Sequence, residues 1–380
     1  MLYPIMPLFL TTVIGAPIAA VGLIEGLAEG TASLTKIVSG RLADRRARKP
    51  MIALGYGISS LAKLLIGLAT TWPVVLAIRF GDRVGKGLRT SPRDAMLADA
   101  TTSDNRGRAF GFHRSMDTAG AVIGPLLGLV LYELLDHQLR PLFFFAFIPA
   151  ALSVLLVGFV RESHRPVPNG TEIAGTEISD TEISLERPPI ESLPNERLPR
   201  TYWRTMAFLG LFSLVNFSDA LILLRASELG LGFVGVIGAY CLYNLVYAAL
   251  AFPAGVVSDR LPRRLVFAAG LVVFSIAYTS LGLVRSPGWV WVILPVYGIY
   301  TALTDGIARA WVADLLPADR RGTGIGTYHG IIGIGAFIAS TWAGLAWGSN
   351  GQVPLMTAGI ATGIIAIVLA FGGRFFESPS

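Results

Sequence analysis

The chain has 380 residues, of which 53% are hydrophobic and only 15% charged, and its mean hydropathy is +0.61. Soluble domains carry about 25% charged residues, so much of the usual water-facing surface is missing. This composition excludes a cytosolic enzyme, a secreted disulfide scaffold and a soluble nucleic-acid binder. The net charge of +6 comes from short Lys and Arg clusters between apolar segments. We therefore expect a helical protein that has the lipid bilayer, and no nucleic acid, as its partner.

Apolar segments that can cross a bilayer occur twelve times, six before and six after a polar stretch. The first is short, because residues 1–15 would rise only about 22 Å as a helix. The segments are residues 1–15, 18–40, 50–70, 72–95, 107–133 and 141–161, then 202–224, 231–256, 264–284, 288–314, 322–347 and 352–374. The sequence predicts an all-α integral membrane protein with twelve transmembrane helices in two six-helix bundles.

The polar stretch between the two sets holds a five-residue repeat, Thr-Glu-Ile at positions 171, 176 and 181, followed by four prolines. Prolines and scattered charges without hydrophobic periodicity are typical of a disordered linker. We predict an amino-terminal bundle of residues 1–161, a cytoplasmic linker of residues 162–200 and a carboxy-terminal bundle of residues 201–380.

Basic residues indicate the orientation of the chain. Loops with several Arg or Lys residues follow the second, fourth, eighth and tenth segments, whereas the intervening loops offer single arginines such as Arg140 and Arg285. The positive-inside rule places the basic loops in the cytoplasm. Both termini then lie in the cytoplasm, and we expect a multi-pass protein of a bacterial inner membrane.

The two halves are related by a constant offset of 215 positions, as Gly40 and Gly255 show. Charged positions keep this offset over some 70 residues: Asp44 matches Asp259, Asp99 matches Asp314, Asp104 matches Asp319 and Arg106 matches Arg321. Two repeats in the same orientation place a substrate site near the midplane, between halves that rock to give alternating access.

The loop after the second segment, GRLADRRARKP, resembles the cytoplasmic loop signature of the major facilitator superfamily, with Ala47 in place of its second glycine. GVVSDRLPRRL is a degenerate copy of it in the second half. Glycine permits close approach of two helices, and the aspartate can accept hydrogen bonds from the amides of a helix N-terminus or pair with an arginine. The predicted conformational gate comprises Gly40, Asp44, Arg45, Arg48, Gly255, Asp259 and Arg260.

The fifth segment carries a glycine pattern that resembles the antiporter motif of proton-coupled drug exporters in that superfamily. The pattern comprises Gly111, Gly120, Gly124, Pro125 and Gly128, and Leu129 replaces a final glycine. The resemblance implies export. The alternative interpretation is ordinary small-residue packing between helices.

The fourth segment places Arg79, Asp82, Arg83, Lys86, Arg89 and Arg93 along one helical stripe. A lipid-facing charge at this depth is costly, so the stripe must face a cavity or pair with neighbours. Similar exporters have an arginine at the position of Arg79, in a pattern R-x-x-Q-G that is thought to assist proton transfer. Here Asp82 and Arg83 replace the Gln and Gly, which weakens any inference about drug specificity.

Further ionisable residues are candidates for proton or substrate binding. Glu25 and Glu29 are one turn apart, and their repulsion favours the neutral form of one of them. Asp117 can neutralise Arg79 or Arg83, and the second half offers Asp219 with Arg225 and Asp305 with Arg309. The predicted coupling residues are Glu25, Glu29, Arg79, Asp82, Arg83, Arg114, Asp117, Asp219 and Asp305; each alternatively serves in a static ion pair.

The chain has no Walker-type phosphate loop, no metal-ligand spacing among its four His residues and its single Cys241, and no nucleophile motif. We expect no enzyme activity, cofactor or metal centre, and a monomer that uses protons and a small-molecule substrate. The leading hypothesis is a proton-coupled exporter of small organic compounds. The alternatives are a proton symporter or facilitator that imports a metabolite, metal ion or metal chelate, and a receptor that transports nothing.

Overall fold

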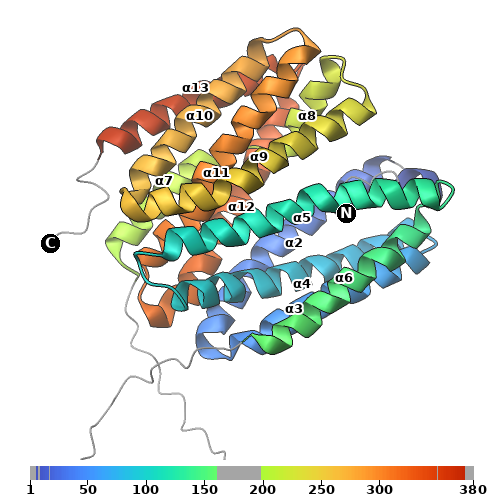
Figure 1. Ribbon diagram of the computed structural model, residues 1–380, viewed down its shortest axis with the longest axis horizontal. Helices are drawn as coiled ribbons and strands as arrows, with labels where there is room; N and C mark the ends of the chain where they lie inside the picture. Colours follow the sequence, from blue (N-terminus) through green and yellow to red (C-terminus); the bar gives the residue numbers. More distant parts are fainter. Residues whose placement is uncertain (1–5, 7–8, 17, 161–197, 349, 373–380) are drawn as a thin grey trace, which may run out of the picture.

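The computed structural model describes residues 6, 9–16, 18–160, 198–348 and 350–372, and these form α-helices without a strand (Figure 1). Three short helices of other types, η1 (Phe9–Val13), η2 (Pro287–Trp289) and η3 (Ala318–Arg320), complete this part of the chain. The α-helices are α2 (Ile18–Arg45), α3 (Arg48–Leu68), α4 (Trp72–Asp99), α5 (Arg106–Leu134), α6 (Arg140–Phe159), α7 (Arg200–Ser213), α8 (Asp219–Glu228), α9 (Phe233–Arg260), α10 (Arg263–Leu283), α11 (Val290–Asp314), α12 (Arg321–Leu345) and α13 (Gln352–Phe371).

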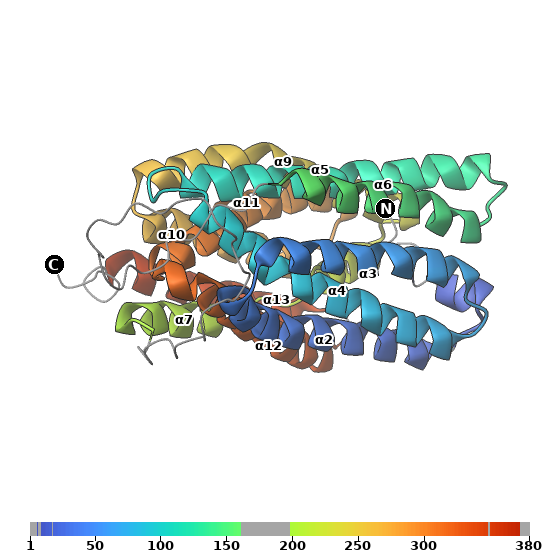
Figure 2. The same cartoon turned by 90° about the horizontal axis from the view of Figure 1, so that it is seen from below.

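The long helices run roughly parallel to one another in two bundles, one from each half of the sequence (Figures 1 and 2). In the first half α4 packs on α2 and α3, and α3 also packs on α6. In the second half α10 packs on α11 and α13, and α9 packs on α11. The halves meet mainly where α5 lies along α9 and α2 lies along α12. The predicted all-α membrane protein with two pseudo-symmetric bundles is confirmed.

The first predicted segment is described only in part. Met6, Phe9 and Leu10 are buried in one apolar cluster with residues such as Val75 and Phe143, which lie near the starts of α4 and α6. This cluster is at the end opposite the α4–α5 connection. Residues 1–5 and nearly all of the predicted linker, 162–200, lie outside the described residues, so the side of the amino terminus and the three-part division stay predictions.

The seventh predicted segment, residues 202–224, is not one continuous helix. It is divided into α7 and α8, and residues 214–218 between them are not helical. Asn216 Nδ2 donates to the Tyr300 hydroxyl at 3.1 Å, and Ser218 Oγ accepts from the amide of Ala220 at 3.3 Å. These side-chain bonds replace helical bonds at the break and start α8. A discontinuous helix within a membrane protein exposes backbone groups where a cavity can use them.

Seven of the described helices are long and apolar enough to cross a bilayer: α3, α5, α6, α9, α10, α11 and α13, with η2 counted into α11. The charged stripe of α4 lowers its hydropathy, and α7 and α8 are each too short to span alone. Large apolar side chains are exposed along the outer helices, such as Leu61 on α3 and Ile364 on α13. Such surfaces are stable only against lipid, so the bilayer is the partner of these faces.

Candidate functional site

Asp44, at the end of α2, binds the first amides of α12 in the other half. Its carboxylate accepts from the amides of Gly322 at 2.7 Å and Thr323 at 2.6 Å. The amides at a helix N-terminus have no intrahelical partner and carry partial positive charge, so they suit a carboxylate. Gly40 makes the approach possible, because a Cβ there would meet the Gly322 carbonyl oxygen.

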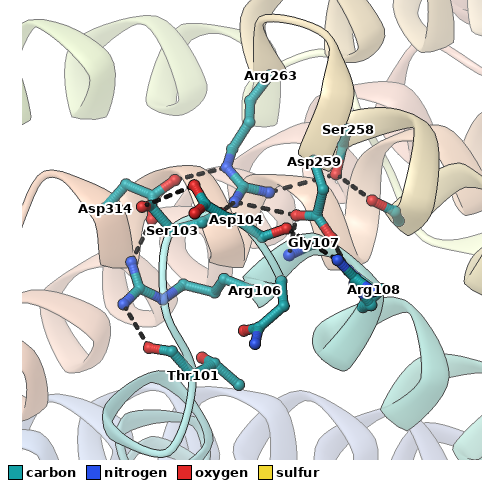
Figure 3. Close-up of polar contacts among 12 residues, drawn as sticks. Thr101, Ser103, Asp104, Arg106, Gly107, Arg108, Ser258, Asp259, Arg263 and Asp314 are labelled. Atoms are coloured by element: carbon teal, nitrogen blue, oxygen red, sulfur yellow. Dashed lines mark hydrogen bonds and ion pairs between the residues drawn. The ribbon is translucent and has the colours of Figure 1, made fainter.

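The second half makes the same contact 215 positions later. Asp259, at the end of α9, accepts from the amides of Gly107 at 2.7 Å and Arg108 at 2.9 Å, which begin α5 (Figure 3). Gly255 lies against the Gly107 carbonyl as Gly40 lies against that of Gly322. The internal repeat is therefore a repeat of contacts between the halves and not only of sequence.

Two bridged aspartates accompany these contacts. Arg48 and Arg321 each lie 2.6 Å from the carboxylate of Asp99. In the equivalent place, Asp314 binds Arg263 at 2.5 Å and also Arg106 (Figure 3). We call the two groups the cytoplasmic locks, after the side on which the positive-inside rule predicts them. They are defined by Asp44, Arg48, Asp99, Arg321 and Gly322 in one group and by Asp259, Arg263, Asp314, Arg106 and Gly107 in the other.

The predicted gate residues are thus only partly brought together. Arg48 is buried in a lock, whereas Arg45 and Arg260 are exposed and lie outside both locks. Arg263, which the sequence analysis did not select, occupies the repeat position of Arg48 and pairs with Asp259 at 3.3 Å. The repeat offset identifies Arg263 from the sequence alone, since positions 48 and 263 are separated by the same 215 residues.

A second ionic group lies deeper, between the halves. Asp305 on α11 binds Arg309 at 2.8 Å, lies 3.6 Å from Arg114 on α5, and accepts from the Tyr247 hydroxyl at 2.5 Å. Arg309 Nε in turn lies 3.6 Å from Asp94 on α4. Asp94 is 1% exposed and lies 3.0 Å from Nε2 of His329 on α12. We call Asp94, Arg114, Asp305, Arg309 and His329 the central network; its charges link α4 and α5 with α11 and α12.

Sequence reasoning missed Asp94 and His329. The repeat offset holds the signal, because Asp94 corresponds to Arg309 and Arg114 corresponds to His329. Residues near a pseudo-two-fold axis meet their own repeat equivalents, so a charged position matched to an opposite charge predicts a pair across the axis.

The predicted stripe of α4 has an ion pair within its own helix. Arg79 lies 3.8 Å from Asp82, and Arg83 is buried. Asp117 does not pair with either arginine; it lies 3.0 Å from Arg114 one turn before it on α5. This corrects the predicted pairing: the bonded partner of Asp117 lies on its own helix, and on α4 it is within electrostatic range of Arg89 and Arg93. The side chains of Glu25 and Glu29 lie outside the described part of the chain.

Asp219 also departs from its predicted partner. Its carboxylate accepts from the hydroxyls of Tyr297 at 2.7 Å and Tyr243 at 3.1 Å. Arg225 instead donates to the carbonyl oxygens of Leu281 and Val284. Asp219 and Arg225 therefore do not pair, since the arginine donates to backbone carbonyls at the end of α10 and lies 4.0 Å from Glu228. The predicted Asp305–Arg309 pair is present.

The glycines of the α5 pattern differ in how closely other helices approach them. Gly111 packs against the Ala251 carbonyl on α9, at the contact between the halves, so a side chain there has no room. A Cβ at Gly120 would meet nothing within 4 Å, and Pro125 lies within the continuous helix. The first glycine thus serves packing between the halves, while the second faces open space.

Comparison with known proteins agrees with this geometry. The sequence matches the Major Facilitator Superfamily over residues 1–242 and 205–379. It is 30% identical to an uncharacterised MFS-type transporter of Methanocaldococcus jannaschii, over 98% of this chain and 90% of that protein. Multidrug resistance protein 1 of Bacillus subtilis is 31% identical over 40% of this chain and 38% of its own length. The human organic anion transporter MFSD10 has the same fold, with a TM-score of 0.70 at 18% identity over 95% of this chain and 88% of that one. The chain belongs to the Major Facilitator Superfamily and is a transporter of that family.

Proposed function

We propose that this transporter is a proton-coupled exporter of small organic compounds that works by alternating access. The central network carries the proposal, because ionisable groups in the membrane interior are expensive and persist where they serve a function. Support also comes from the glycine pattern of α5 and from the partial similarity to a multidrug resistance protein. We place the protein in the cytoplasmic membrane of a bacterium, as a monomer with both termini inside.

The cytoplasmic locks define the conformation that the transporter leaves when it opens inward. Asp44 and Asp259 each hold the start of a helix from the opposite half. Opening on this side separates α2 from α12 and α5 from α9, so both carboxylates must release their amides. The transport cycle therefore exchanges these polar contacts for water at the cytoplasmic surface, where water can replace them.

Proton coupling acts on the central network. Asp117 has a side chain that is 53% exposed and binds Arg114, whose side chain is 12% exposed. A proton on Asp117 removes the negative charge beside Arg114, which then depends on Asp305 alone among the carboxylates it contacts. The Arg79–Asp82 pair offers a second place where protonation of a carboxylate weakens an ion pair. When protonation changes which of these ion pairs form, the free energy of the contact between the halves changes. Coupling requires such a difference in free energy between the protonated and deprotonated states.

The first test measures proton movement into proteoliposomes with an imposed pH gradient, reported by a pH-sensitive dye. The panel consists of organic cations, anionic metabolites and divalent metals. We expect an organic compound to collapse the gradient by counterflow in the unaltered protein. Asp117→Asn should abolish this effect while Glu133→Gln, an acid-to-amide change at the exposed Glu133–His137 pair, leaves it intact.

The same assay separates the alternatives. Gradient collapse with solute and protons moving in the same direction would replace export by symport of a metabolite, metal ion or chelate. Solute movement without proton movement would assign a facilitator. A folded protein that moves no solute on the panel while binding one would favour a receptor and contradict the proposal.

A further inference from the structure

Asp219 differs from the other carboxylates of the described helices. Among the helical carboxylates whose side chains the structure describes, each of the others has an Arg or His within 4.0 Å, for example Asp82 with Arg79 and Asp305 with Arg309. Within the described residues, Asp219 has hydroxyl partners but no basic side chain at ion-pair distance. The neighbouring positive potential comes from the N-terminus of α8, where Asp219 is the first residue. Asp219 is therefore a carboxylate whose charge no described basic side chain pairs with.

Aromatic rings surround this carboxylate on two helices. Tyr243 on α9 and Tyr297 on α11 bind it directly, and their ring centroids are 5.2 Å apart. Tyr240 and Tyr300 extend the group, with centroids 5.9 Å from Tyr243 and 5.2 Å from Tyr297 respectively. Asp219 and Tyr240 are half-buried, whereas the other three rings are buried. The carboxylate and one ring thus stay accessible at the edge of an aromatic cluster.

This combination has a defined chemical preference. The faces of tyrosine rings attract cations, and a carboxylate in low dielectric attracts them more strongly. An anion would be repelled by Asp219, and a neutral apolar solute would leave its charge uncompensated. The break between α7 and α8, which places Asp219 at a helix start, puts the group where a discontinuous helix of a transporter binds its substrate.

We propose that Asp219 and the tyrosines Tyr240, Tyr243, Tyr297 and Tyr300 form the binding site for the positively charged group of an organic cation. The inference rests on the proposed transport function and names its substrate class. The cation and a proton compete for the same carboxylate, so binding of one expels the other. This competition supplies the exchange step of antiport at a single residue.

The groups that face Asp219 leave it as the titrating member of the site. Tyr243 on α9, Tyr278 on α10 and Tyr297 and Tyr300 on α11 lie within electrostatic range, and Asp305 on α11 adds negative potential from the central network. Arg225 on α8 donates to backbone carbonyls and lies 4.0 Å from the carboxylate of Glu228. Tyrosines stay neutral at physiological pH, so protons and cations act on Asp219.

The test compares two probes of matched size and opposite charge, tetraphenylphosphonium and tetraphenylborate, by equilibrium dialysis against the purified full-length protein. We expect the cation to bind more tightly than the anion, and Asp219→Asn to weaken cation binding by about tenfold or more. Glu133→Gln should leave it unchanged. Addition of the cation in weakly buffered solution should release protons from the unaltered protein and not from Asp219→Asn.

A second pair of variants addresses the rings in case Asp219→Asn folds poorly. Tyr243→Phe keeps the ring and should retain most of the binding, whereas Tyr243→Leu should weaken it. Equal cation binding in Asp219→Asn and the unaltered protein, or anion binding as tight as cation binding, would overturn the site, whatever the proteoliposome assay shows. Cation binding that depends on Asp219 without collapse of a pH gradient would keep the site and refute proton-coupled export.

Discussion

Asp94 and Arg309 are repeat equivalents that contact each other. Both occupy the same place in their halves, and the approximate two-fold relation brings them to 3.6 Å. Identical residues at such a place would repel if charged, so a charged pair on the axis requires that the two halves diverge in sign. Arg114 and His329 diverge in the same neighbourhood. The chemistry of the centre therefore depends on how the repeats differ, while the cytoplasmic locks depend on how they agree.

The Asp94–Arg309 pair can be measured by a double-mutant cycle. Asp94→Asn removes the carboxylate beside Arg93 and one of the two carboxylates beside the buried Arg309, and we expect a loss of about 3 kcal/mol in unfolding free energy. Arg309→Gln should cost a similar amount. The double variant should be less destabilised than the sum, because the interaction between the two side chains is lost only once. Thermal unfolding in detergent measures all four proteins, and strict additivity would show that the pair is not coupled.

At the scale of elements, the break in the seventh segment fixes the position of Asp219. Ser218 Oγ accepts from the amide of Ala220, and the Ser218 amide donates to Ser340 Oγ on α12 at 3.0 Å. The first bond caps α8, and the second holds the break against a neighbouring helix. Asp219 owes its place beside Tyr243 and Tyr297 to this start of the helix.

Ser218→Ala removes the cap and should lower the stability of the protein by about 1 kcal/mol. We expect organic-cation binding to weaken as well, because a frayed α8 no longer holds Asp219 against its tyrosines. Ser218→Thr preserves the hydroxyl and is the matched control. The unfolding midpoint and the cation affinity from equilibrium dialysis are measured for both variants. Equal midpoints and equal affinities for Ser218→Ala and Ser218→Thr would exclude a capping role.

Most helices could be predicted from hydropathy, because a span needs a long apolar run and polar loops bound it. The break at residues 214–218 could not, because LVNFS contains neither glycine nor proline, and the bond of Asn216 to Tyr300 joins positions 84 residues apart. Ion pairs show the same difference between local contacts and contacts between distant positions. Asp305 with Arg309 and Asp117 with Arg114 each lie within one turn of a single helix and follow from spacing, whereas the tyrosine partners of Asp219 lie on other helices and depend on how the helices rotate against each other.

At the scale of the whole molecule, two equivalent locks close one side. They join α2 to α12 and α5 to α9, and each consists of a carboxylate on helix amides beside an aspartate bridged by two arginines. The locks meet where Arg106 and Arg321 donate to the same Ala98 carbonyl. The carboxylates of Asp44 and Asp259 share no hydrogen-bond partner, so we expect their contributions to the closed state to add. In the proposed alternating-access cycle the molecule opens inward only when both locks have released, so weakening either one should shift the same equilibrium.

Asp44→Asn and Asp259→Asn remove the charge while keeping the shape of each lock. Each change should favour the inward-open state by about 1 kcal/mol, which is roughly fivefold, and the double variant by about 2 kcal/mol, which is roughly 30-fold.

Ala98 is fully buried in α4 between the two locks, and its carbonyl accepts from Arg106 and Arg321. An Ala98→Cys reporter in a Cys241→Ser background reacts with a maleimide only when the cytoplasmic side opens. Labelling from that side should accelerate in each single variant and further in the double variant. Equal acceleration in single and double variants would mean that one lock controls the closure and that the symmetry of contacts is not a symmetry of energies.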